Sequence, residues 1–386
     1  MKPRAIVVVC DGLGVGPAPD ADRFGDAGRK TLQHILRDGR PELPNLTRLG
    51  LLHTLYEDAP AGLPAPIGAF GRLAEASAGK DTTTGHWELM GLTVDTPFPL
   101  YPDGFPPEVL EPFEAAVGLR ALGNKAASGT VILDELGEEQ MRTGRPIVYT
   151  SGDSVFQIAA HEEAIGIERL YQWCEIARAI LRPPHQVGRV IARPYVGEGK
   201  GRFKRTHRRR DYTVAPTSPT LLDRAAAAGM SVHGLGKIED IFSGRGVTSA
   251  LHTESNRDGI QKTIEAIRER DDDIVFTNLV DFDSKYGHRN DPVGYARCLE
   301  ELDAFLPELL EALRPADLLM FTADHGGDPS DVSTDHTREY VPMVAYGAGF
   351  GAGQDVGTRA TFADLGATVA EHIGIPPVAG TSFLPR

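Results

Sequence analysis

Acidic and histidine side chains recur in this sequence where buried strands are expected to end. Asp11 directly follows the apolar run of residues 4–10, and two later apolar runs end in Asp-Phe-Asp and Asp-His-Gly-Gly-Asp motifs. Ligands of open α/β sheets bind beyond the carboxyl ends of the strands, so these side chains are expected to meet at one sheet edge. The candidate ligands are Asp11, Asp283, His288, Asp324, His325 and His336.

These six mixed carboxylate and imidazole groups exceed the needs of one tetrahedral ion and suit two divalent ions. A pair of ions about 4 Å apart favours phosphoryl chemistry. Ligands rich in oxygen and free of thiolate indicate Mn²⁺, Mg²⁺ or Zn²⁺ rather than copper or an iron–sulfur cluster. A single Asp or His at a strand end is more often a cap or a turn former, but scattered caps would not favour histidine. The cluster therefore predicts a two-metal site.

The segment of residues 80–88, Lys-Asp-Thr-Thr-Thr-Gly-His-Trp-Glu, offers a nucleophile for such a site. A hydroxyl bound to a metal ion loses its proton more readily, and a Thr in a tight turn is suitable. A threonine-rich helix start with Glu88 nearby would give the same pattern. On these residues alone, a nucleophile and a helix cap are about equally supported.

A basic stretch runs from Arg189 to Arg210 and contains nine Lys and Arg residues against one Glu, in a chain whose net charge is −14. Arginine side chains bind phosphate oxygens in a bidentate manner. Aromatic residues are few in the stretch, so stacking on nucleic-acid bases is not supported and a small phosphorylated substrate is favoured. A solvated loop is the structural alternative.

Two smaller features could contact the same substrate. Ser151 and Asp153 follow a short strand expected over residues 146–150 and could bind a sugar, although a turn is the simpler interpretation. Lys237 lies in a Gly-Leu-Gly-Lys segment after another expected strand. It could meet a phosphate or be a surface lysine in a glycine turn.

Four apolar runs without alternation predict strands covered on both faces, and helical spacing separates several of them. Such strands alternating with helices are typical of a doubly wound α/β sheet. Proline-containing segments near residues 97–107 and 214–219 predict domain boundaries. We therefore expect a core of residues 1–96 and 216–386, interrupted by an inserted domain of residues 97–215. The expected core strands cover residues 4–10, 273–278, 317–323 and 341–346.

The 386 residues have the composition of a soluble globular protein, with 41% hydrophobic and 24% charged residues, which excludes a disordered or collagen-like chain. No apolar run approaches the ~20 residues that a membrane-spanning helix needs, so no membrane partner is expected. Three cysteines without paired spacing favour a reducing compartment and a cytoplasmic location. An acidic chain repels nucleic acid on average, so no nucleic-acid partner is expected.

Together these motifs are highly specific, and the chain resembles the bacterial phosphopentomutase family of the alkaline phosphatase superfamily over nearly its whole length. The resemblance implies an alkaline-phosphatase-like doubly wound core with an inserted smaller α/β cap domain. It implies two Mn²⁺ ions, with Mg²⁺ or Zn²⁺ as alternatives, and Thr82 as a nucleophile that is phosphorylated in the active form. The implied ligands are Asp283, His288 and His336 for one ion, and Asp11, Asp324 and His325 for the other, with Thr82 beside it.

The resemblance also implies the substrate contacts and the reaction. The implied contacts are Ser151, Asp153, Arg193 and Arg209 of the cap and Lys237 of the core. The family has Asn where this chain has Arg208, so the choice among the arginines of residues 205–210 stays open. The implied reaction interconverts ribose 1-phosphate and ribose 5-phosphate, or their 2-deoxyribose equivalents, through a phospho-threonine enzyme and a 1,5-bisphosphate. A sugar bisphosphate such as glucose 1,6-bisphosphate would prime the threonine.

Three other functions stay open at this point. A phosphatase or phosphodiesterase of the same superfamily would share the metal ligands. A cofactor-independent phosphoglycerate mutase would share the core, but that family uses a serine nucleophile and a longer chain. A non-catalytic metal- or nucleic-acid-binding protein would use the basic stretch instead. The sequence does not indicate an oligomeric state.

Overall fold

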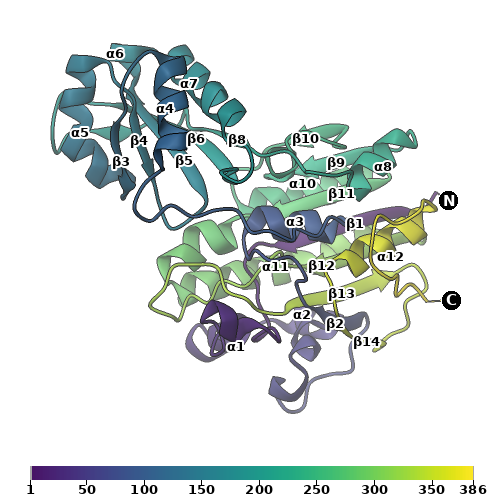
Figure 1. The fold of residues 1–386 in the computed structure, drawn as a ribbon. Helices are drawn as coiled ribbons and strands as arrows, with labels where there is room; N and C mark the ends of the chain where they lie inside the picture. The colour runs from purple at the N-terminus through teal and green to yellow at the C-terminus, as the bar shows by residue number, and fades with distance from the viewer. Residues whose placement is uncertain (1, 386) are drawn as a thin grey trace. The chain divides into compact units, whose positions relative to one another are not determined.

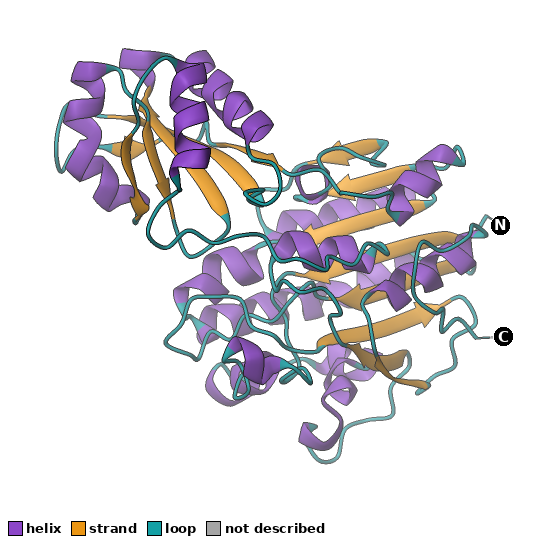
Figure 2. Ribbon diagram, viewed as in Figure 1, coloured by secondary structure: helices purple, strands orange, loops and turns teal. Residues whose placement is uncertain are grey.

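The computed structural model describes residues 2–385. The chain divides into two compact units, one formed by Met1–Thr96 and Pro216–Arg386 and the other by Pro97–Ala215. Both divisions fall in the proline-containing segments, which suit neither a helix interior nor a central strand. Each unit has its own sheet with helices packed against it (Figures 1 and 2).

The larger unit is built on one eight-stranded sheet. Its strands are β1 (Arg4–Cys10), β2 (Ala69–Leu73), β9 (Val232–Leu235), β10 (Ser249–Leu251), β11 (Ile274–Leu279), β12 (Asp317–Thr322), β13 (Val341–Gly347) and β14 (Asp355–Arg359). Their order is β10-β9-β11-β1-β12-β13-β2-β14. The central strands β11, β1 and β12 are parallel and buried along their whole length. Burial on both faces explains why these runs are apolar without alternation.

Helices cover both faces of this sheet (Figure 2). They are η1 (Ala21–Phe24), α1 (Thr31–Asp38), α2 (Pro44–Leu49), η2 (Leu51–Asp58), α3 (Thr82–Leu89), α8 (Leu221–Ala227), α9 (Ile238–Ile241), α10 (Asn256–Glu269), η3 (Phe282–Tyr286), η4 (Gly287–Arg289), α11 (Pro292–Ala312) and α12 (Ala363–Ile373). Helices α3 and α12 contact each other on one face, and α10 packs against α11 on the other (Figure 1). The predicted apolar side of α10, with Ile260, Ile264 and Ile267, is buried.

One strand of the core runs against its neighbours. β13 pairs antiparallel with both β12 and β2. The connection from β12 to β13 contains no helix, and antiparallel strands need no helical crossover. The strand expected over residues 341–346 is therefore present, but it does not continue the strand–helix–strand repeat. The other three expected strands lie within one residue of their predicted bounds.

The smaller unit is also a mixed α/β structure. Its strands are β3 (Leu122–Ala126), β4 (Ile147–Thr150), β5 (Val155–His161), β6 (Arg189–Val196), β7 (Lys204–Arg205) and β8 (Arg210–Thr213), and its helices are α4 (Pro107–Val117), α5 (Gly129–Thr143), α6 (Glu162–Ile165) and α7 (Ile167–Ile180). The order is β3-β4-β5-β6-β7, with β8 also paired to β6. In one hydrophobic core, α4 and α7 pack against Phe156. In a second hydrophobic core, α5 packs against Tyr149. The basic stretch contains β6, β7 and the first residue of β8, while many of its basic side chains are exposed.

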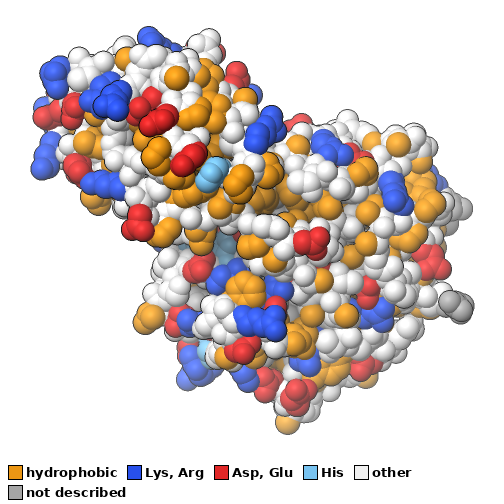
Figure 3. Space-filling view, viewed as in Figure 1, with side chains coloured by type: hydrophobic (Ala, Val, Ile, Leu, Met, Phe, Trp, Pro, Cys, Tyr) orange, Lys and Arg blue, Asp and Glu red, His pale blue; other side chains and the backbone are white. Residues whose placement is uncertain are grey.

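Among residues 2–385, no helix has both the length and the apolar character needed to cross a bilayer. On the face drawn in Figure 3, acidic and basic side chains are interspersed. The net charge of −14 is therefore not gathered there into one acidic surface.

Candidate metal centre

Three neighbouring strands bring acidic side chains to one edge of the larger sheet. Strands β11, β1 and β12 are adjacent and parallel, so their carboxyl ends lie together. Asp11 follows β1, Asp324 follows the end of β12, and Asp283 lies in the π-helical turn η3 after β11. All three carboxylates are buried. Buried carboxylates are costly unless donors or cations compensate their charge.

Asp11, Asp324 and His325 form a first group, in which one ligand atom of each residue lies within 4.8 Å of the others. The Nε2 atom of His325 is 3.4 Å from Asp11 Oδ1 and 3.3 Å from Asp324 Oδ2. The other ring nitrogen, Nδ1, lies 2.9 Å from the carbonyl oxygen of Gly326 and donates to it. In neutral His325 the lone pair of Nε2 therefore faces the carboxylates, as it does in metal-binding histidines.

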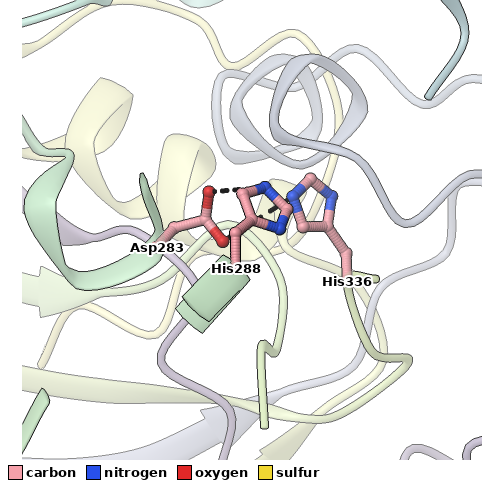
Figure 4. A group of neighbouring side chains, drawn as sticks. All are labelled: Asp283, His288 and His336. Atoms are coloured by element: carbon pink, nitrogen blue, oxygen red, sulfur yellow. Dashed lines mark ion pairs between the residues drawn. The ribbon is translucent and has the colours of Figure 1, made fainter. Parts of the chain in front are cut away.

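Asp283, His288 and His336 form a second group with the same spacing limit of 4.8 Å (Figure 4). The Nε2 atoms of His288 and His336 lie 3.1 Å from Asp283 Oδ2 and 3.8 Å from Asp283 Oδ1, respectively. His288 Nδ1 lies 2.6 Å from the carbonyl oxygen of Thr334, which fixes Nδ1 as the donor. Both imidazoles turn toward the same carboxylate, and His288 keeps Nε2 available as a ligand.

The two groups adjoin each other. The rings of His325 and His336 stack with their centroids 3.8 Å apart. Gly12 lies between the groups, because a Cβ atom on it would be 3.5 Å from Asp283 Cβ and 3.6 Å from His325 Cε1. The six residues predicted as ligands are therefore gathered into one site of two parts.

Unpaired ligand atoms indicate that this site is built for cations. The buried side-chain atoms without a hydrogen-bond partner include Asp11 Oδ1, Asp324 Oδ2, Asp283 Oδ1 and His336 Nε2. Leaving a buried polar atom unpaired costs roughly 1–3 kcal/mol, so native proteins seldom do it. A divalent cation in each group would take up these lone pairs. The donor set of carboxylates and imidazoles fits Mn²⁺, Mg²⁺ or Zn²⁺.

The pKa values of two candidate ligands are shifted by their charged neighbours. Burial by itself would raise the pKa of Asp283, but the adjacent imidazoles of His288 and His336 hold it well below its usual value. Burial lowers the pKa of His325, yet Asp324 and Asp11 raise it further, and the net result lies well above the usual value. A metal ion would therefore have to displace a proton from His325.

Thr82, the predicted nucleophile, is the first residue of α3. Asp81 caps this helix, because its side chain accepts hydrogen bonds from the backbone N–H groups of Thr83 and Thr84. The Thr82 Oγ1 atom lies 3.1 Å from His325 Nε2, so the hydroxyl faces the first group of ligands. The helix-cap and nucleophile interpretations of the segment are thus compatible, since the cap fixes the residue that faces the site.

Two residues of α3 had no role in the sequence-based prediction. A Cβ atom on Gly85 would lie 1.9 Å from the carbonyl oxygen of Asp324, so glycine is needed for α3 to approach this backbone. His86 is fully buried, with Nδ1 2.9 Å from the carbonyl oxygen of Thr82. A glycine inside a helix, where alanine is the better helix former, is a signal that could have identified this contact.

Buried acids also hold the loop that carries His336. Asp328 Oδ2 lies 2.7 Å from His34 Nδ1 of α1. Glu339 accepts hydrogen bonds from the hydroxyl groups of Thr31 and Thr337, at 2.6 and 2.7 Å. The loop is therefore tied to the start and the middle of α1. Asp328 lies within a motif used in the prediction, but its partner His34 is 294 positions away and could not be predicted from the motif.

Three of the four predicted substrate contacts of the smaller unit belong to a charged cluster, namely Asp153, Arg193 and Arg209. Arg193 Nε donates to Gln157 Oε1 at 2.9 Å, and burial together with the nearby Arg209 lowers the pKa of Arg193 to about 10. Arg209 makes two hydrogen bonds of 2.7 Å to Asp211. Asp153 pairs with Arg189 at 3.3 Å. The cluster thus combines arginines with two carboxylates that partly compensate their charge.

Arg208, the residue that departs from the family pattern, points to a different partner. Its guanidinium pairs with Glu162 at the start of α6, and its carbonyl oxygen accepts from Tyr171. The side chain of Arg209, in contrast, is near Arg193. These contacts support Arg209 rather than Arg208 as the member of the cluster.

The remaining two predicted contacts lie in loops. Ser151 follows β4 and is partly exposed. Lys237 is exposed and follows Gly236 at the end of β9. Gly236 has φ +77°, and a Cβ there would lie 2.4 Å from the carbonyl oxygen of Asn278, so glycine is required at this position. Lys237 therefore starts from the same edge of the larger sheet as the metal ligands.

Comparison with solved structures shows the fold. The structure of the PH0037 protein from Pyrococcus horikoshii matches with a TM-score of 0.50 and 16% identity, covering 97% of this chain and 98% of that one. At this level of identity the match concerns the fold and not the activity. The predicted α/β fold class is confirmed.

Comparison of sequences shows the family. Residues 3–377 match the Metalloenzyme superfamily. A phosphopentomutase from Caldanaerobacter subterraneus subsp. tengcongensis is 54% identical over 385 residues, covering 100% of this chain and 98% of its own. One from Alkaliphilus metalliredigens is 55% identical over 382 residues, covering 98% of each chain. The resemblance found in the motifs is confirmed, and the chain belongs to the phosphopentomutase family of the metalloenzyme superfamily.

Proposed function

We propose that this protein interconverts ribose 1-phosphate and ribose 5-phosphate, and the 2-deoxyribose equivalents, with Thr82 as the phosphoryl carrier. Family membership makes the chain an intramolecular phosphotransferase. The observation that carries the proposal is the position of Thr82 Oγ1, 3.1 Å from the ligand atom Nε2 of His325 and beside a group of unpaired ligand atoms. A hydroxyl there is suited to receive and release a phosphoryl group.

The ligand set would hold two divalent cations, for which we propose Mn²⁺, with Mg²⁺ or Zn²⁺ as alternatives. Asp283, His288 and His336 would hold one, and Asp11, Asp324 and His325 the other. When bound, such cations offset the charge on phosphoryl oxygens and make a nearby hydroxyl easier to deprotonate.

The chain's own residues provide position and charge for the transfer. Phospho-Thr82 would give its phosphoryl group to the free hydroxyl of a pentose monophosphate, so that one P–O bond breaks and one forms, while the hydroxyl proton passes to Thr82. The resulting 1,5-bisphosphate would then return its other phosphoryl group to Thr82 by the reverse step. Net transfer from one sugar oxygen to the other follows without loss of phosphate.

The second phosphate of the bisphosphate needs a binding group of its own. We assign this role to Arg193 and Arg209, whose planar guanidinium groups suit phosphate oxygens, and to Lys237. Ser151 and Asp153 would contact the sugar hydroxyls. The pairing of Arg209 with Asp211 supports this assignment, because it holds the guanidinium in one orientation before substrate binds.

The first phosphorylation of Thr82 requires a donor. We propose a sugar bisphosphate such as glucose 1,6-bisphosphate, because it carries a phosphoryl group in excess of the monophosphate substrates. Small-molecule sugar phosphates would then be the only partners that the reaction needs.

The test is ³¹P NMR of the enzyme with ribose 5-phosphate, Mn²⁺ removed before detection, with and without glucose 1,6-bisphosphate. A mutase converts the 5-phosphate signal into a 1-phosphate signal, whereas a phosphatase produces inorganic phosphate. Intact-mass analysis after priming should show one added phosphoryl group, and peptide mapping should locate it at Thr82. Inorganic phosphate as the main product, or a phosphoryl group at another residue, would contradict the proposal.

A further inference from the structure

Two fully buried polar side chains lie directly behind the candidate metal centre. His86 belongs to α3 and Asn278 to β11, and the exposed fraction of each is 0%. Asn278 Nδ2 lies 2.9 Å from Asp11 Oδ2 and 3.3 Å from His86 Nε2. His86 Nδ1 lies 2.9 Å from the carbonyl oxygen of Thr82. A continuous chain of hydrogen bonds therefore joins the candidate nucleophile to a candidate metal ligand.

The neighbours of His86 fix the direction of these bonds. Nδ1 faces two acceptors, the carbonyl oxygen of Thr82 and, at 3.1 Å, Asp324 Oδ2, so Nδ1 must carry the hydrogen. In the neutral ring Nε2 is then an acceptor, and it receives one N–H of Asn278. The second N–H of the same amide donates to Asp11. One amide group thus serves both the metal ligand and the histidine.

The two ends of the Asn278 amide differ, because the NH₂ group has two partners and the carbonyl oxygen has none. Its Oδ1 atom is buried without a hydrogen-bond partner. A buried carbonyl that loses its water partners and gains none destabilises the fold, so an apolar side chain of the same shape would avoid this penalty. The useful part of the side chain is therefore the NH₂ group. The two N–H groups donate to Asp11 and to His86.

We propose that Asn278 and His86 are positioning residues, which set the place of Thr82 relative to the metal ligand Asp11. Asn278 orients the carboxylate of Asp11, and His86 ties the first turn of α3 to Asn278. Hydrogen bonds of this kind, behind the ligands themselves, tune metal affinity and orientation. The inference rests on the proposed role of Thr82 as phosphoryl carrier and deepens it.

Asn278→Leu tests the proposal, because it keeps the approximate shape and removes the amide. We expect the Kd for Mn²⁺, measured by titration calorimetry on the full chain without substrate, to rise roughly 10-fold or more. We expect kcat to fall by a similar factor, with KM for ribose 5-phosphate within about 2-fold of the original. Loss of the amide leaves Asp11 Oδ2 and His86 Nε2 without this donor, so the melting temperature of the metal-free protein should also fall modestly. Unaltered Mn²⁺ affinity together with unaltered kcat would overturn the proposal.

Two polar substitutions of His86 separate the two ends of the chain of hydrogen bonds. In His86→Asn, the side-chain amide takes the place of Nδ1 and keeps the bond to Thr82, while contact with Asn278 is lost. In His86→Gln, the amide takes the place of Nε2, so contact with Asn278 stays and the bond to Thr82 is lost. Because Nδ1 also lies 3.1 Å from the proposed ligand Asp324, we expect His86→Gln to lose both kcat and Mn²⁺ affinity, whereas His86→Asn should lose Mn²⁺ affinity and keep most of kcat. Equal losses of both quantities in both variants would indicate a merely structural role.

Two controls separate failure of this inference from failure of the proposed function. His233→Asn changes another buried imidazole, which hydrogen-bonds Ser249 at the other side of β11, and should keep both kcat and Mn²⁺ affinity. Thr82→Ala is assayed in parallel. If Thr82→Ala keeps kcat, the proposed function fails. If it loses kcat while Asn278→Leu and both His86 variants lose nothing, only the positioning role fails.

Discussion

Thr82 and Thr83 are neighbours of the same type, but they differ in what their side chains face. The Thr82 hydroxyl lies 3.1 Å from His325, whereas Thr83 is buried and contributes its backbone N–H to the Asp81 cap. The difference follows from α3, because successive residues of a helix point about 100° apart. A helix start can therefore present one hydroxyl to the metal centre and direct the next one away from it.

This pair gives the first prediction at the residue scale. Thr82→Ala should reduce mutase turnover by roughly 10³-fold or more, since it removes the phosphoryl carrier. Its Kd for Mn²⁺ should stay within a few-fold, because the six proposed ligands are intact. Thr83→Ala is the matched control and should keep most of the activity. Coupled measurement of ribose 5-phosphate formation gives the rates, and residual turnover in Thr82→Ala comparable to that of Thr83→Ala would contradict the assignment.

A second prediction at this scale concerns protons. Asp324 and Asp11 raise the pKa of His325 above its usual value against the effect of burial, so the metal-free ring keeps its proton to a higher pH than an ordinary histidine does. A metal ion binds only the deprotonated ring. Mn²⁺ affinity should therefore rise with pH through neutrality, and binding should release protons. Calorimetry in buffers of different ionisation enthalpy measures that release, and a pH-independent affinity between pH 6 and 8 would count against His325 as a ligand.

At the scale of elements, the position of α3 depends on the lack of a side chain at Gly85. Helix propensity alone predicts that alanine at this position stabilises the helix by about 1 kcal/mol. Packing predicts the reverse, because the added Cβ would lie 1.9 Å from the carbonyl oxygen of Asp324. Overpacking of this kind typically costs roughly 1–3 kcal/mol and forces backbone shifts. We therefore expect the cost of the close contact between α3 and the end of β12 to exceed the gain in helix propensity.

Gly85→Ala should therefore lower both the melting temperature and kcat, since the shift moves Thr82 away from His325. Gly28→Ala provides the control, because a Cβ at Gly28 would meet no atom within 4 Å and its φ is not positive. Thermal unfolding and turnover of the two variants are compared under the same metal concentration. A Gly85→Ala protein as stable and as active as Gly28→Ala would show that the close approach is not required.

The elements also show which parts of the site could be predicted from sequence. Strands buried on both faces leave continuous apolar runs, and the residues after them were predicted as ligands because parallel strands end at one edge. The direction of β13 could not be predicted, since a buried antiparallel strand has the same apolar pattern. The contact between Asn278 and His86 could not be predicted for a similar reason. It is the penultimate residue of β11, and only the fold brings α3 close enough for His86 to meet it.

At the scale of the whole molecule, the proposed reaction draws on both units. The larger unit holds the candidate metal ligands and Thr82, whereas the smaller unit holds Arg193 and Arg209. The excess of basic residues indicated a stretch but not its members, and Arg193 and Arg209 were named only by the family resemblance. Contacts in the folded unit separate them, because Arg208 pairs with Glu162 while Arg209 pairs with Asp211 near Arg193. The partner that each arginine has in the folded unit decides which charge is available to a ligand.

This division predicts that substrate affinity and metal affinity can be changed separately. Arg193→Ala removes a guanidinium that we assign to phosphate, and loss of a charge-assisted hydrogen bond of about 1.5–3 kcal/mol should raise KM for ribose 5-phosphate roughly 10- to 100-fold. The Kd for Mn²⁺ should not change, because no proposed metal ligand belongs to the smaller unit.

Arg208→Ala is the matched control. It removes an arginine of the same basic stretch whose side chain pairs with Glu162, and KM should stay within about 2-fold. Steady-state kinetics and calorimetry on the two variants decide the matter. A larger rise in KM for Arg208→Ala than for Arg193→Ala would reverse the assignment, and a joint loss of Mn²⁺ affinity would mean that the two binding functions are not separate.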